Sequence, residues 1–457
     1  MNSVVSDQII AQSVAAGTTA LRPPWTKEAP LKIAISVATI GIIALASSLS
    51  ADQEVGAFKQ IDAYWSYLAP IARVFGLILL FALAVRTLIW LFYKPFRYKG
   101  GPLPRLTVVI PAYNEGAMVE KSILSIVAAD YPRELLEVIA VDDGSKDDTW
   151  MYIERARHQH PGVVRSVRLD RNRGKRAALY TGFKAARGEV ILTMDSDSVV
   201  ANETLKNMVA PFLADARIGA VAGNVKVLNR NDNFLTRMLW VRYVMAFDYT
   251  RAYQSVCRTV TCCPGALTAY RASALQGVVE NWMNQQFLGG SCTYGEDRAM
   301  TNYILNAGYD AVYQRNALVY TVVPQTFKGL SRMYTRWARS NIRESMIFGK
   351  QIFTSQRKWR GAAFSVFDFL TTFAILPLQY LLITYTYYLI LHSPVFFIQA
   401  MAGVAFGSLI YMMYYVRTEK STDFIYGIAY SFYSFFALQW IMPYAALTLR
   451  NRSWMTR

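Results

Sequence analysis

The sequence predicts an α/β domain with a mainly parallel sheet, inserted between two blocks of membrane helices. Two observations support this fold class. Hydrophobic residues make up 53% of the 457-residue chain and charged residues only 17%, and the longest apolar runs lie near the two ends, as membrane spans would require. The mixed segment between them alternates short apolar runs with helical patterns, and polar residues follow several of these runs. This is typical of sheets that bind ligands at the ends of their strands.

Two apolar runs near the N-terminus form the first predicted membrane block, residues 33–93. The first run is Ile33 to Leu49 and the second is Tyr67 to Phe92. A basic group follows the second run, namely Lys94, Arg97, Lys99 and Arg105. Because lysine and arginine gather on the cytoplasmic side of spans, the N-terminal tail (residues 1–32) and the central segment (residues 94–325) are expected in the cytoplasm. The same rule accounts for the net charge of +17 without a nucleic-acid partner.

The central segment begins with successive β-α units. Apolar, β-prone runs at about residues 106–112, 136–141 and 163–169 predict strands, each followed by a helical pattern, and the third helix is expected over residues 177–186. Such units produce a right-handed, mainly parallel sheet. The cationic loop Arg171 to Arg176 before the third helix suits a phosphorylated ligand. The four cysteines also lie in the central segment without metal-type spacing, so we expect them to be reduced.

A fourth apolar run, residues 190–194, ends in Asp195 and Asp197. In a buried parallel strand this spacing directs the last side chains to the carboxyl edge of the sheet, where open α/β folds bind ligands. Two carboxylates there, completed by substrate phosphates, suit Mg²⁺ or Mn²⁺. The alternative is a surface turn, because Asp and Ser are common turn residues.

Four motifs occur in the order seen in inverting family 2 glycosyltransferases. They are residues 109–115 (Val-Ile-Pro-Ala-Tyr-Asn-Glu), 141–145 (Val-Asp-Asp-Gly-Ser), 172–175 (Asn-Arg-Gly-Lys) and 195–197 (Asp-Ser-Asp). Residues 242–248, 254–255, 262–265, 282–285 and 295–298 further resemble hyaluronan synthases and, nearly as closely, the chitin-oligosaccharide synthases of nodulation. The resemblance covers roughly residues 100–457. It implies the Rossmann-like GT-A fold and an inverting hexosyltransferase.

The resemblance implies a UDP-sugar site at these motifs. The residues that correspond to donor-binding positions are Ala112, Tyr113, Glu115, Asp142, Asp143, Lys175 and Asp195. Asp142 and Asp143 would accept hydrogen bonds from uracil or ribose, and Lys175 would offset phosphate charge. Asp197 would bind the metal directly, with Asp195 near the metal or the nucleotide. A cation there neutralises the diphosphate as it leaves.

The acceptor hydroxyl loses a proton as it attacks the sugar, and a carboxylate general base can take that proton. Asp297 corresponds to the base of the family, and its neighbour Glu296 is the second candidate, because the family places its Asp second in this pair. The alternative for Asp297 is an N-cap role at the start of a helix. Cys262 corresponds to a cysteine that lies at the acceptor sugar in hyaluronan synthases. The alternative for Cys262 is a small buried apolar side chain.

An amphipathic segment, residues 326–361, is expected to lie at the membrane interface. Its Arg336 and Trp337 match the last two residues of the Gln-Gln-x-Arg-Trp motif of processive members, whereas both Gln positions differ. The resemblance implies that Arg336 pairs with pyrophosphate and that Trp337 stacks on the acceptor sugar. A plain interfacial anchor is the alternative.

The C-terminal block contains two predicted spans, Phe364 to Leu391 and Val395 to Tyr415, within residues 362–416. The last run, Phe424 to Leu449, would as a third span carry the arginines that follow it to the outside, against the positive-inside rule. We therefore interpret residues 417–457 as an interfacial or re-entrant segment with a C-terminal tail. Residues 453–457 resemble the Trp-Gly-Thr-Arg gating loop of hyaluronan synthases, which assigns Trp454 and Arg457 to the bound donor.

The leading hypothesis is a multi-pass enzyme of the inner or plasma membrane. It would polymerise UDP-sugars with its cytoplasmic domain and conduct the growing polysaccharide outward through its own helices in the lipid bilayer. Hyaluronan, made from UDP-GlcNAc and UDP-GlcA, is the first choice of product, and a chitin-type polymer made from UDP-GlcNAc alone is the second. A single transfer to a lipid carrier is a further alternative. An inactive transport or scaffold protein is disfavoured, because every expected carboxylate is present.

Overall fold

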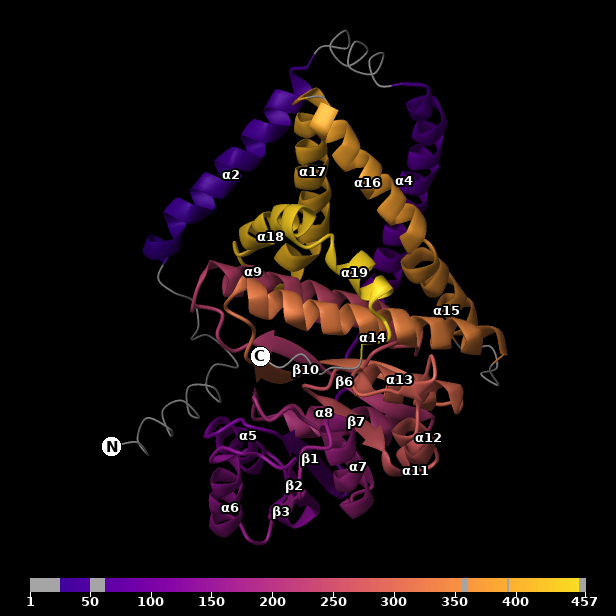
Figure 1. The fold of residues 1–457 in the computed structure, drawn as a ribbon. Helices are drawn as coiled ribbons and strands as arrows, with labels where there is room; N and C mark the ends of the chain where they lie inside the picture. Colours follow the sequence, from indigo (N-terminus) through magenta and orange to yellow (C-terminus); the bar gives the residue numbers. More distant parts are fainter. Residues whose placement is uncertain (1–24, 50–61, 355–360, 393, 452–457) are drawn as a thin grey trace.

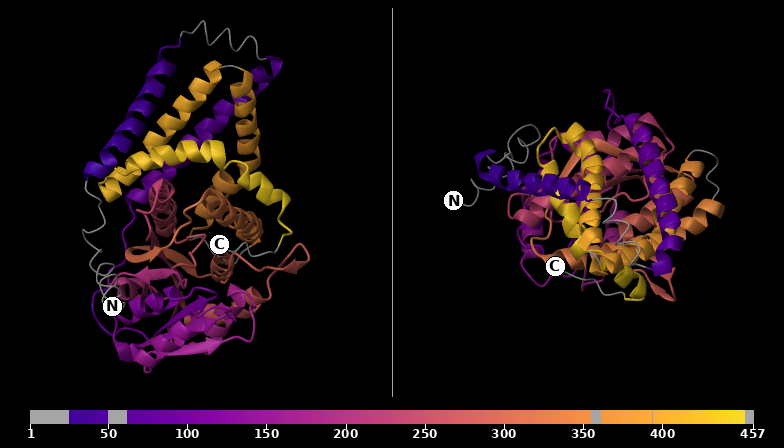
Figure 2. Two further views of the ribbon diagram at one scale, coloured as in Figure 1. Left: turned by 60° about the vertical axis from the view of Figure 1, so that its left-hand side comes forward. Right: turned by 90° about the horizontal axis from the view of Figure 1, so that it is seen from above.

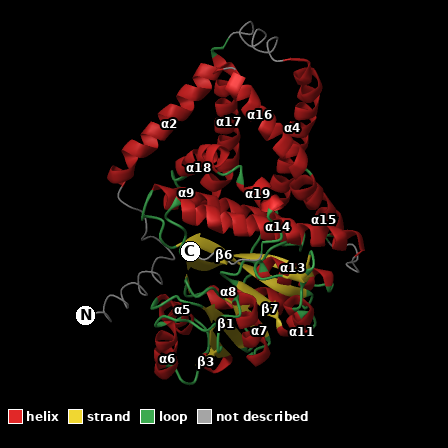
Figure 3. Cartoon of the chain, in the orientation of Figure 1, coloured by secondary structure: helices red, strands yellow, loops and turns green. Residues whose placement is uncertain are grey.

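The computed structural model describes residues 25–49, 62–354, 361–392 and 394–451. A domain built on a sheet lies at one end of the molecule and a group of long helices at the other (Figure 1; Figure 3). Between them lie α9 (Phe234–Tyr243) and the long helix α14 (Phe327–Thr354). The predicted arrangement, an α/β domain inserted between N- and C-terminal helices, is therefore confirmed.

The sheet has eight strands in the order β3-β2-β1-β4-β7-β6-β10-β5. Their bounds are β1 (Leu106–Ala112), β2 (Leu136–Asp142), β3 (Val164–Arg168), β4 (Val190–Thr193), β5 (Ser198–Val200), β6 (Ile218–Val227), β7 (Thr268–Arg271) and β10 (Asp310–Thr321). Strands β3, β2, β1 and β4 run parallel to one another, and so do β6 and β10. Strand β7 is antiparallel to both of its neighbours, and β5 is antiparallel to β10. The mainly parallel sheet is thus confirmed, with two antiparallel insertions.

Helices cover both faces of this sheet, which is why all seven residues of β1 are buried and read as a continuous apolar run. The helices of the domain are α5 (Met118–Val127), η1 (Arg133–Leu135), α6 (Thr149–Gln159), α7 (Lys175–Ala185), α8 (Thr204–Ala214), α11 (Ala272–Gln276), α12 (Val279–Met283) and α13 (Glu296–Asn306). A two-stranded hairpin, β8 (Gln286–Phe287) with β9 (Gly290–Ser291), leads toward α13.

Two local differences from the expected elements shape the site. Helix α7 begins at Lys175, two residues earlier than expected, because Gly174 before it has φ 89°, a backbone conformation that glycine adopts without strain. Strand β4 already ends at Thr193, so Asp195 and Asp197 lie in the loop after the strand and not on the strand itself. The next residues return at once into the sheet as β5.

Four described helices are long and apolar enough to cross a membrane. These candidate spans are Glu28–Ser47, Pro70–Leu91, Ala362–His392 and Pro394–Glu419. They belong to α2 (Trp25–Ser47), to α4 (Asp62–Leu91), to α15 (Ala362–Phe369) continued by η3 (Leu370–Ala374) and α16 (Leu376–His392), and to α17 (Pro394–Glu419). They correspond to the four spans that the sequence predicts, and the exact domain boundaries stay predictions.

The last apolar run is not one straight helix. It forms α18 (Phe424–Ala437) and α19 (Ile441–Leu447), which are bent by 46° relative to each other. Figure 2 shows α18 crossing the lower end of the long helices and not running alongside them. This geometry supports an interfacial or re-entrant segment, an interpretation that stays a prediction.

Ion pairs join the sheet domain to the helices above it. Asp423, just before α18, lies 2.7 Å from Lys32 of α2 and 3.4 Å from Arg230, which follows β6. Lys226 of β6 lies 2.6 Å from Glu419 at the end of α17. The side chain of Asp423 is largely buried, and breaking a buried pair costs more than breaking an exposed one. These contacts therefore fix α17 and α18 on the sheet domain.

Two further helices, η2 (Val244–Tyr249) and α10 (Thr250–Val256), follow α9 along the chain.

Candidate active site

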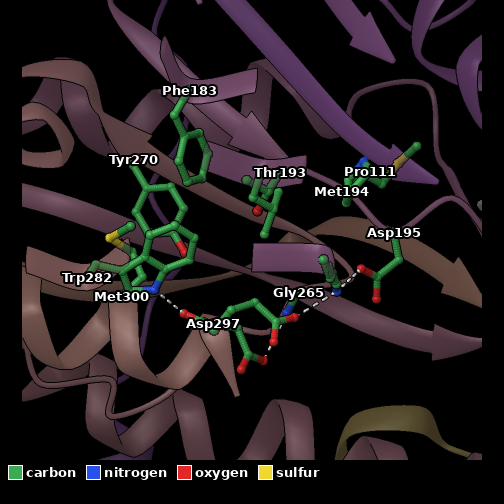
Figure 4. Close-up of a pocket in the computed structure, with 13 residues that line it drawn as sticks. Pro111, Phe183, Thr193, Met194, Asp195, Gly265, Tyr270, Trp282, Asp297 and Met300 are labelled. Atoms are coloured by element: carbon green, nitrogen blue, oxygen red, sulfur yellow. Dashed lines mark hydrogen bonds and ion pairs between the residues drawn. The ribbon is translucent and has the colours of Figure 1, made fainter. Parts of the chain in front are cut away.

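The predicted site residues come together where β1, β2 and β4 end. A pocket opens there, lined by Lys175, Asp195, Glu296 and Asp297 among others (Figure 4). Aromatic side chains of Phe183, Tyr270 and Trp282 form its inner wall. The pocket thus has a charged mouth over an apolar wall.

Lys175 is the centre of this charged mouth. Its Nζ lies 2.5 Å from Asp195 Oδ1 and 3.0 Å from Glu296 Oε1. Burial acts to lower the pKa of Lys175, but the carboxylates of Asp195 and Glu296 outweigh it and raise that pKa above its ordinary value. Burial likewise acts to raise the pKa of Glu296, whereas Lys175, and more weakly Arg336, lower it below the ordinary range. Lys175 and Glu296 therefore form a stable ion pair.

Asp297 differs from its neighbour in its environment. Its Oδ1 accepts a hydrogen bond from the backbone N–H of Arg298 at 2.7 Å, and its Oδ2 accepts one from Gly265 at 3.2 Å. Burial raises the pKa of Asp297, and the adjacent charge of Glu296 raises it further. A carboxylate with a raised pKa is the stronger proton acceptor, so Asp297 suits a general base better than Glu296 does.

The N-cap alternative for Asp297 is wrong. Gly295 occupies the N-cap of α13 in the left-handed conformation, with φ 74°, and Asp297 is the second residue of the helix. A side chain on Gly295 would also collide with α14, because a Cβ there would lie 1.9 Å from Ser340 Oγ. The indole of Trp282 donates to the carbonyl oxygen of Glu296 at 2.8 Å. The turn that carries both carboxylates is therefore held from two sides.

The donor motifs line the neighbouring strand ends. Asp143 accepts hydrogen bonds from the backbone N–H groups of Arg173 and Gly174, both at 2.8 Å, and so organises the cationic loop. Burial raises its pKa despite these bonds. Asp142 is fully buried, accepts from Ser145 N–H at 3.0 Å and pairs with Arg168 at 3.1 Å. Both carboxylates thus already have protein partners.

The motif at the end of β1 completes this edge. The carbonyl oxygen of Ala112 accepts a hydrogen bond from Asp143 N–H at 2.8 Å, so β1 and the Asp142-Asp143 pair are in register. Tyr113 is half-buried, and the N–H of Glu115 donates to Thr149 Oγ1 at 2.8 Å. Ala112 thus adjoins the acidic pair, and Glu115 is tied to the first residue of α6.

The chemistry of the donor set fits a divalent cation. Asp195 and Asp197 lie after β4 and would supply two oxygen ligands. Asp197 is nine-tenths buried, and its Oδ1 accepts from Ser198 Oγ at 3.1 Å and Thr321 Oγ1 at 3.2 Å. Within the described ranges, three or more His, Cys, Asp or Glu side chains are nowhere grouped as a metal cluster. The remaining ligands would come from phosphate and water, as Mg²⁺ and Mn²⁺ sites commonly arrange.

One of the two predicted acceptor residues, Cys262, lies beside Asp297. The thiol of Cys262 is 4.0 Å from Asp297 Oδ2, and burial raises its pKa to about 11, so it is a neutral thiol. The four cysteines all lie in the described part of the chain and none forms a disulfide. Trp337 on α14 is 40% exposed and packs against Tyr243 and Tyr334, with ring centroids 6.3 and 5.6 Å away.

Trp454 and Arg457 lie outside the described residues, so their assignment to the donor stays a prediction. The chain up to Asn451 is described, and the carbonyl oxygen of Asn451 accepts a hydrogen bond from Tyr294 Oη at 2.8 Å. Tyr294 precedes Glu296 by two residues. The last described residue is thus attached to the loop that precedes α13, the helix on which Glu296 and Asp297 lie.

Comparison with known proteins identifies the family. Residues 107–279 match the family described as glycosyl transferase family 2. A hyaluronan synthase of Streptococcus pyogenes serotype M3 is 32% identical over 390 residues, which cover 84% of this chain and 90% of that protein. The chain belongs to glycosyl transferase family 2. The resemblance predicted from the sequence motifs is confirmed.

The transferase is also similar to two N-acetylglucosaminyltransferases. The protein of Rhizobium meliloti is 35% identical over 247 residues, covering 54% of this chain and 58% of that protein. The protein of Azorhizobium caulinodans is 29% identical over 359 residues, covering 78% and 87%. Among solved structures, a mannosyltransferase of Pyrobaculum calidifontis, in complex with GDP-Man and Mn²⁺, matches with a TM-score of 0.52 at 24% identity, over 81% of this chain and 98% of that one. This likeness shows the GT-A fold.

Sequence reasoning missed several residues that position the site of the transferase. Gly265, Trp282 and Gln285 lie in segments that carry the resemblance, but their types gave no chemical role. Gly265 approaches the carboxylates through its backbone, and only a close backbone approach explains a glycine there. Glu344 on α14 was also missed, because one acidic residue in a basic helix is usually solvated.

Gly265→Ala should lower the transfer rate of the enzyme by about tenfold to a hundredfold. The new Cβ would lie 2.9 Å from Lys175 Nζ and 3.4 Å from Asp195 Oδ1, and a charged hydrogen bond that must shift is worth about 1.5–3 kcal/mol. Sugar transfer by purified protein measures the effect. Gly162→Ala is the matched control, since no atom lies within 4 Å of a Cβ there. Equal rates for both variants would contradict the tight packing at Lys175.

Proposed function

We propose that the transferase is a processive polysaccharide synthase of the cell membrane that makes hyaluronan from UDP-GlcNAc and UDP-GlcA. The observation that carries the proposal is the extent of the likeness to the streptococcal hyaluronan synthase. Its 390 residues are more than the sheet domain and α14 together contain, so the likeness continues into the membrane helices. A lone catalytic domain shared by many transferases would not extend so far.

The geometry supports an inverting, single-displacement transfer. Asp297 takes the proton of the acceptor hydroxyl as that oxygen attacks the anomeric carbon, and the bond to the diphosphate of UDP breaks on the opposite side. The half-buried Arg336 and the ammonium group of Lys175, which Glu296 holds in place, supply positive charge near the leaving group. The backbone N–H groups of Gly265 and Arg298 keep the Asp297 carboxylate aimed at the acceptor. Asp297 thus carries out the proton transfer, whereas its neighbour Glu296 holds the lysine that faces the diphosphate.

A divalent cation, Mg²⁺ or Mn²⁺, held by Asp197 and Asp195, would neutralise the diphosphate. The mannosyltransferase that shares the fold was solved with a nucleotide-diphosphate sugar and Mn²⁺, which supports this class of ligands. Asp142 and Asp143 lie where the nucleoside is bound in this proposal. Their burial favours a single, fixed orientation of the donor.

The acceptor side favours a polymer over a single transfer. Trp337 offers an exposed aromatic face on α14, packed against Tyr243 and Phe247. The helix α14 lies directly under the membrane helices (Figure 1). Sugar rings stack on such faces, and a chain extended there would point toward the helices. We propose that these helices conduct the product across the lipid bilayer, with the sheet domain in the cytoplasm.

A chitin-type polymer made from UDP-GlcNAc alone is the second candidate. The N-acetylglucosaminyltransferase of Rhizobium meliloti is 35% identical over the part it shares, against 32% for the hyaluronan synthase. That shared part is shorter, which is why we rank this product second. In either case the tail that follows Asn451 would act as a lid, with Trp454 and Arg457 over the bound donor.

The deciding experiment supplies purified protein with UDP-GlcNAc and UDP-GlcA, each alone and together. We expect long, hyaluronidase-sensitive polymer only with both donors. UDP-GlcNAc alone should give at most short oligosaccharides and correspondingly little UDP. The variant Asp297→Asn is the negative control. Long polymer from the single donor would establish the chitin-type product instead. A product attached to lipid and extended by one sugar would overturn polymer synthesis.

A further inference from the structure

A buried carboxylate outside the pocket connects the elements that build the active site. Glu344 of α14 has no exposed surface. Its Oε1 accepts from Arg343 Nε at 2.7 Å and from Gln285 Nε2 at 3.1 Å, and its Oε2 accepts from Asn302 Nδ2 at 3.2 Å. A buried charge persists only where such donors satisfy it. Three donors for one carboxylate indicate a fixed side chain.

Each donor leads to a different part of the catalytic machinery. Gln285 Oε1 accepts from both terminal nitrogens of Arg176 at 3.1 Å, and Arg176 directly follows Lys175. Asn302 lies on α13, the helix that begins with Glu296 and Asp297, and it also donates to the Glu344 carbonyl oxygen at 3.1 Å. Arg343 donates to the carbonyl oxygen of Tyr294. Glu344 thus reaches α7, α13 and the loop before α13 at once.

The same helix also carries Arg336, assigned to the pyrophosphate of the donor, and Trp337, assigned to the acceptor sugar. Both lie about two turns before Glu344. The helix is also pressed against the catalytic turn, since a Cβ on Gly295 would overlap Ser340. A rotation or shift of α14 therefore moves the acceptor platform relative to the base, and the hydrogen bonds of Glu344 oppose such a shift.

We propose that Glu344 is a positioning residue that holds the acceptor helix α14 in register with the donor and base residues on α7 and α13. The inference rests on the proposed transfer reaction. In this role Glu344 aligns the acceptor hydroxyl with the anomeric carbon, and it binds neither sugar. When the alignment is lost, the donor still binds, and water replaces the acceptor hydroxyl as the attacking group.

The charges of the network explain why an amide cannot replace the carboxylate. Arg176 and Arg343 are only 4% and 6% exposed. Burial lowers the pKa of Arg176, and the nearby carboxylates Glu296 and Glu344 oppose this effect. Without the charge of Glu344, Glu296 alone of these two carboxylates opposes the burial of Arg176, and Arg176 then competes with Lys175 for it. The catalytic turn then shifts toward Arg176.

The test measures UDP release and sugar incorporation in the same reaction, for the full-length protein in its membrane or detergent environment. In Glu344→Gln we expect sugar incorporation to fall about 10- to 100-fold, the range that an ångström-scale misplacement causes. UDP release should fall less, so that the ratio of UDP released to sugar incorporated rises severalfold. Glu344→Asp, which keeps the charge, should restore much of the coupling. The KM for the donor should change little in both variants.

Two further variants make the result decisive. Glu280→Gln on α12 is the matched control, because its side chain is 56% exposed, and it should leave the ratio unchanged. If Glu344→Gln does not fold, Gln285→Leu breaks the link to Arg176 while it keeps the carboxylate, and it should raise the ratio in the same direction. A ratio equal to that of the parent in these variants would overturn the positioning role. A parent protein that releases no UDP from either donor would instead overturn the proposed function.

Discussion

Asp297→Asn should abolish sugar transfer and leave donor binding intact. An amide keeps the shape of the side chain, and its single oxygen can keep the 2.7 Å contact with the N–H of Arg298, while the longer contact with Gly265 is lost. It cannot accept the proton of the attacking hydroxyl. Because deprotonation is needed only in the chemical step, the loss should appear in kcat, by about 10²–10⁴-fold, and not in the Kd for UDP-sugar.

Titration calorimetry with UDP and a transfer assay on the same preparation separate these two quantities. Glu296→Gln is the informative comparison, because it removes the partner of Lys175 and should weaken donor binding as well as transfer. Normal turnover by folded Asp297→Asn would rule out this residue as the base. If Asp297→Asn and Glu296→Gln lost affinity for UDP to the same extent, both carboxylates would have a role in donor binding.

The same assignment determines the pH profile. Burial and the charge of Glu296 raise the pKa of Asp297 in the folded enzyme, and the base acts only when it is deprotonated. Activity should therefore fall on the acid side at a pH above the ordinary Asp value of about 3.9. In Glu296→Gln the repulsion is gone, so the pKa of Asp297 falls and the acid limb should move to lower pH.

The sequence predicts those parts of the site that depend on residue type and local position. Asp142, Asp143 and Asp195 follow apolar runs, and the carboxyl ends of parallel strands meet at one edge of a sheet. Their convergence was therefore predictable, and the structure brings them to that edge. The antiparallel strand β7 between β4 and β6 was not predictable in the same way, because a run of four residues carries too weak a periodicity.

The parts that depend on tertiary contacts were beyond the sequence. Lys175 was assigned to phosphate from its motif, but its two carboxylate partners come from separate elements. Gly295 shows why Asp297 is not an N-cap, and its role needs both its positive φ and the closeness of Ser340. Glu344 acquires its role only through three donors that the fold brings to it. Apart from Arg343, which adjoins Glu344, the partners are distant in sequence and no local pattern marks them.

Removal of divalent cations should abolish transfer, and Asp197→Asn should reproduce most of that loss in the presence of metal. Asp197 is buried, and its Oδ1 is oriented by the hydroxyls of Ser198 and Thr321, so it can present a fixed oxygen ligand. Mutation of groups that orient or bind a metal commonly costs 10–100-fold in affinity or activity, and loss of a direct ligand should cost at least that. The KM for UDP-sugar should rise together with the fall in kcat.

The metal dependence of UDP binding distinguishes this role from that of the base. After chelation with EDTA, parent protein and Asp297→Asn should both regain tight UDP binding when Mg²⁺ or Mn²⁺ is added, because their carboxylates at residues 195 and 197 are intact. Asp197→Asn should show the weak, metal-free affinity under both conditions. The exposed carboxylate Asp170 supplies the control, since Asp170→Asn removes the same charge near a strand end without touching the loop after β4. Full transfer in EDTA, or a normal metal response in Asp197→Asn, would remove this residue from the metal site and leave the diphosphate to Lys175 and the arginines around it.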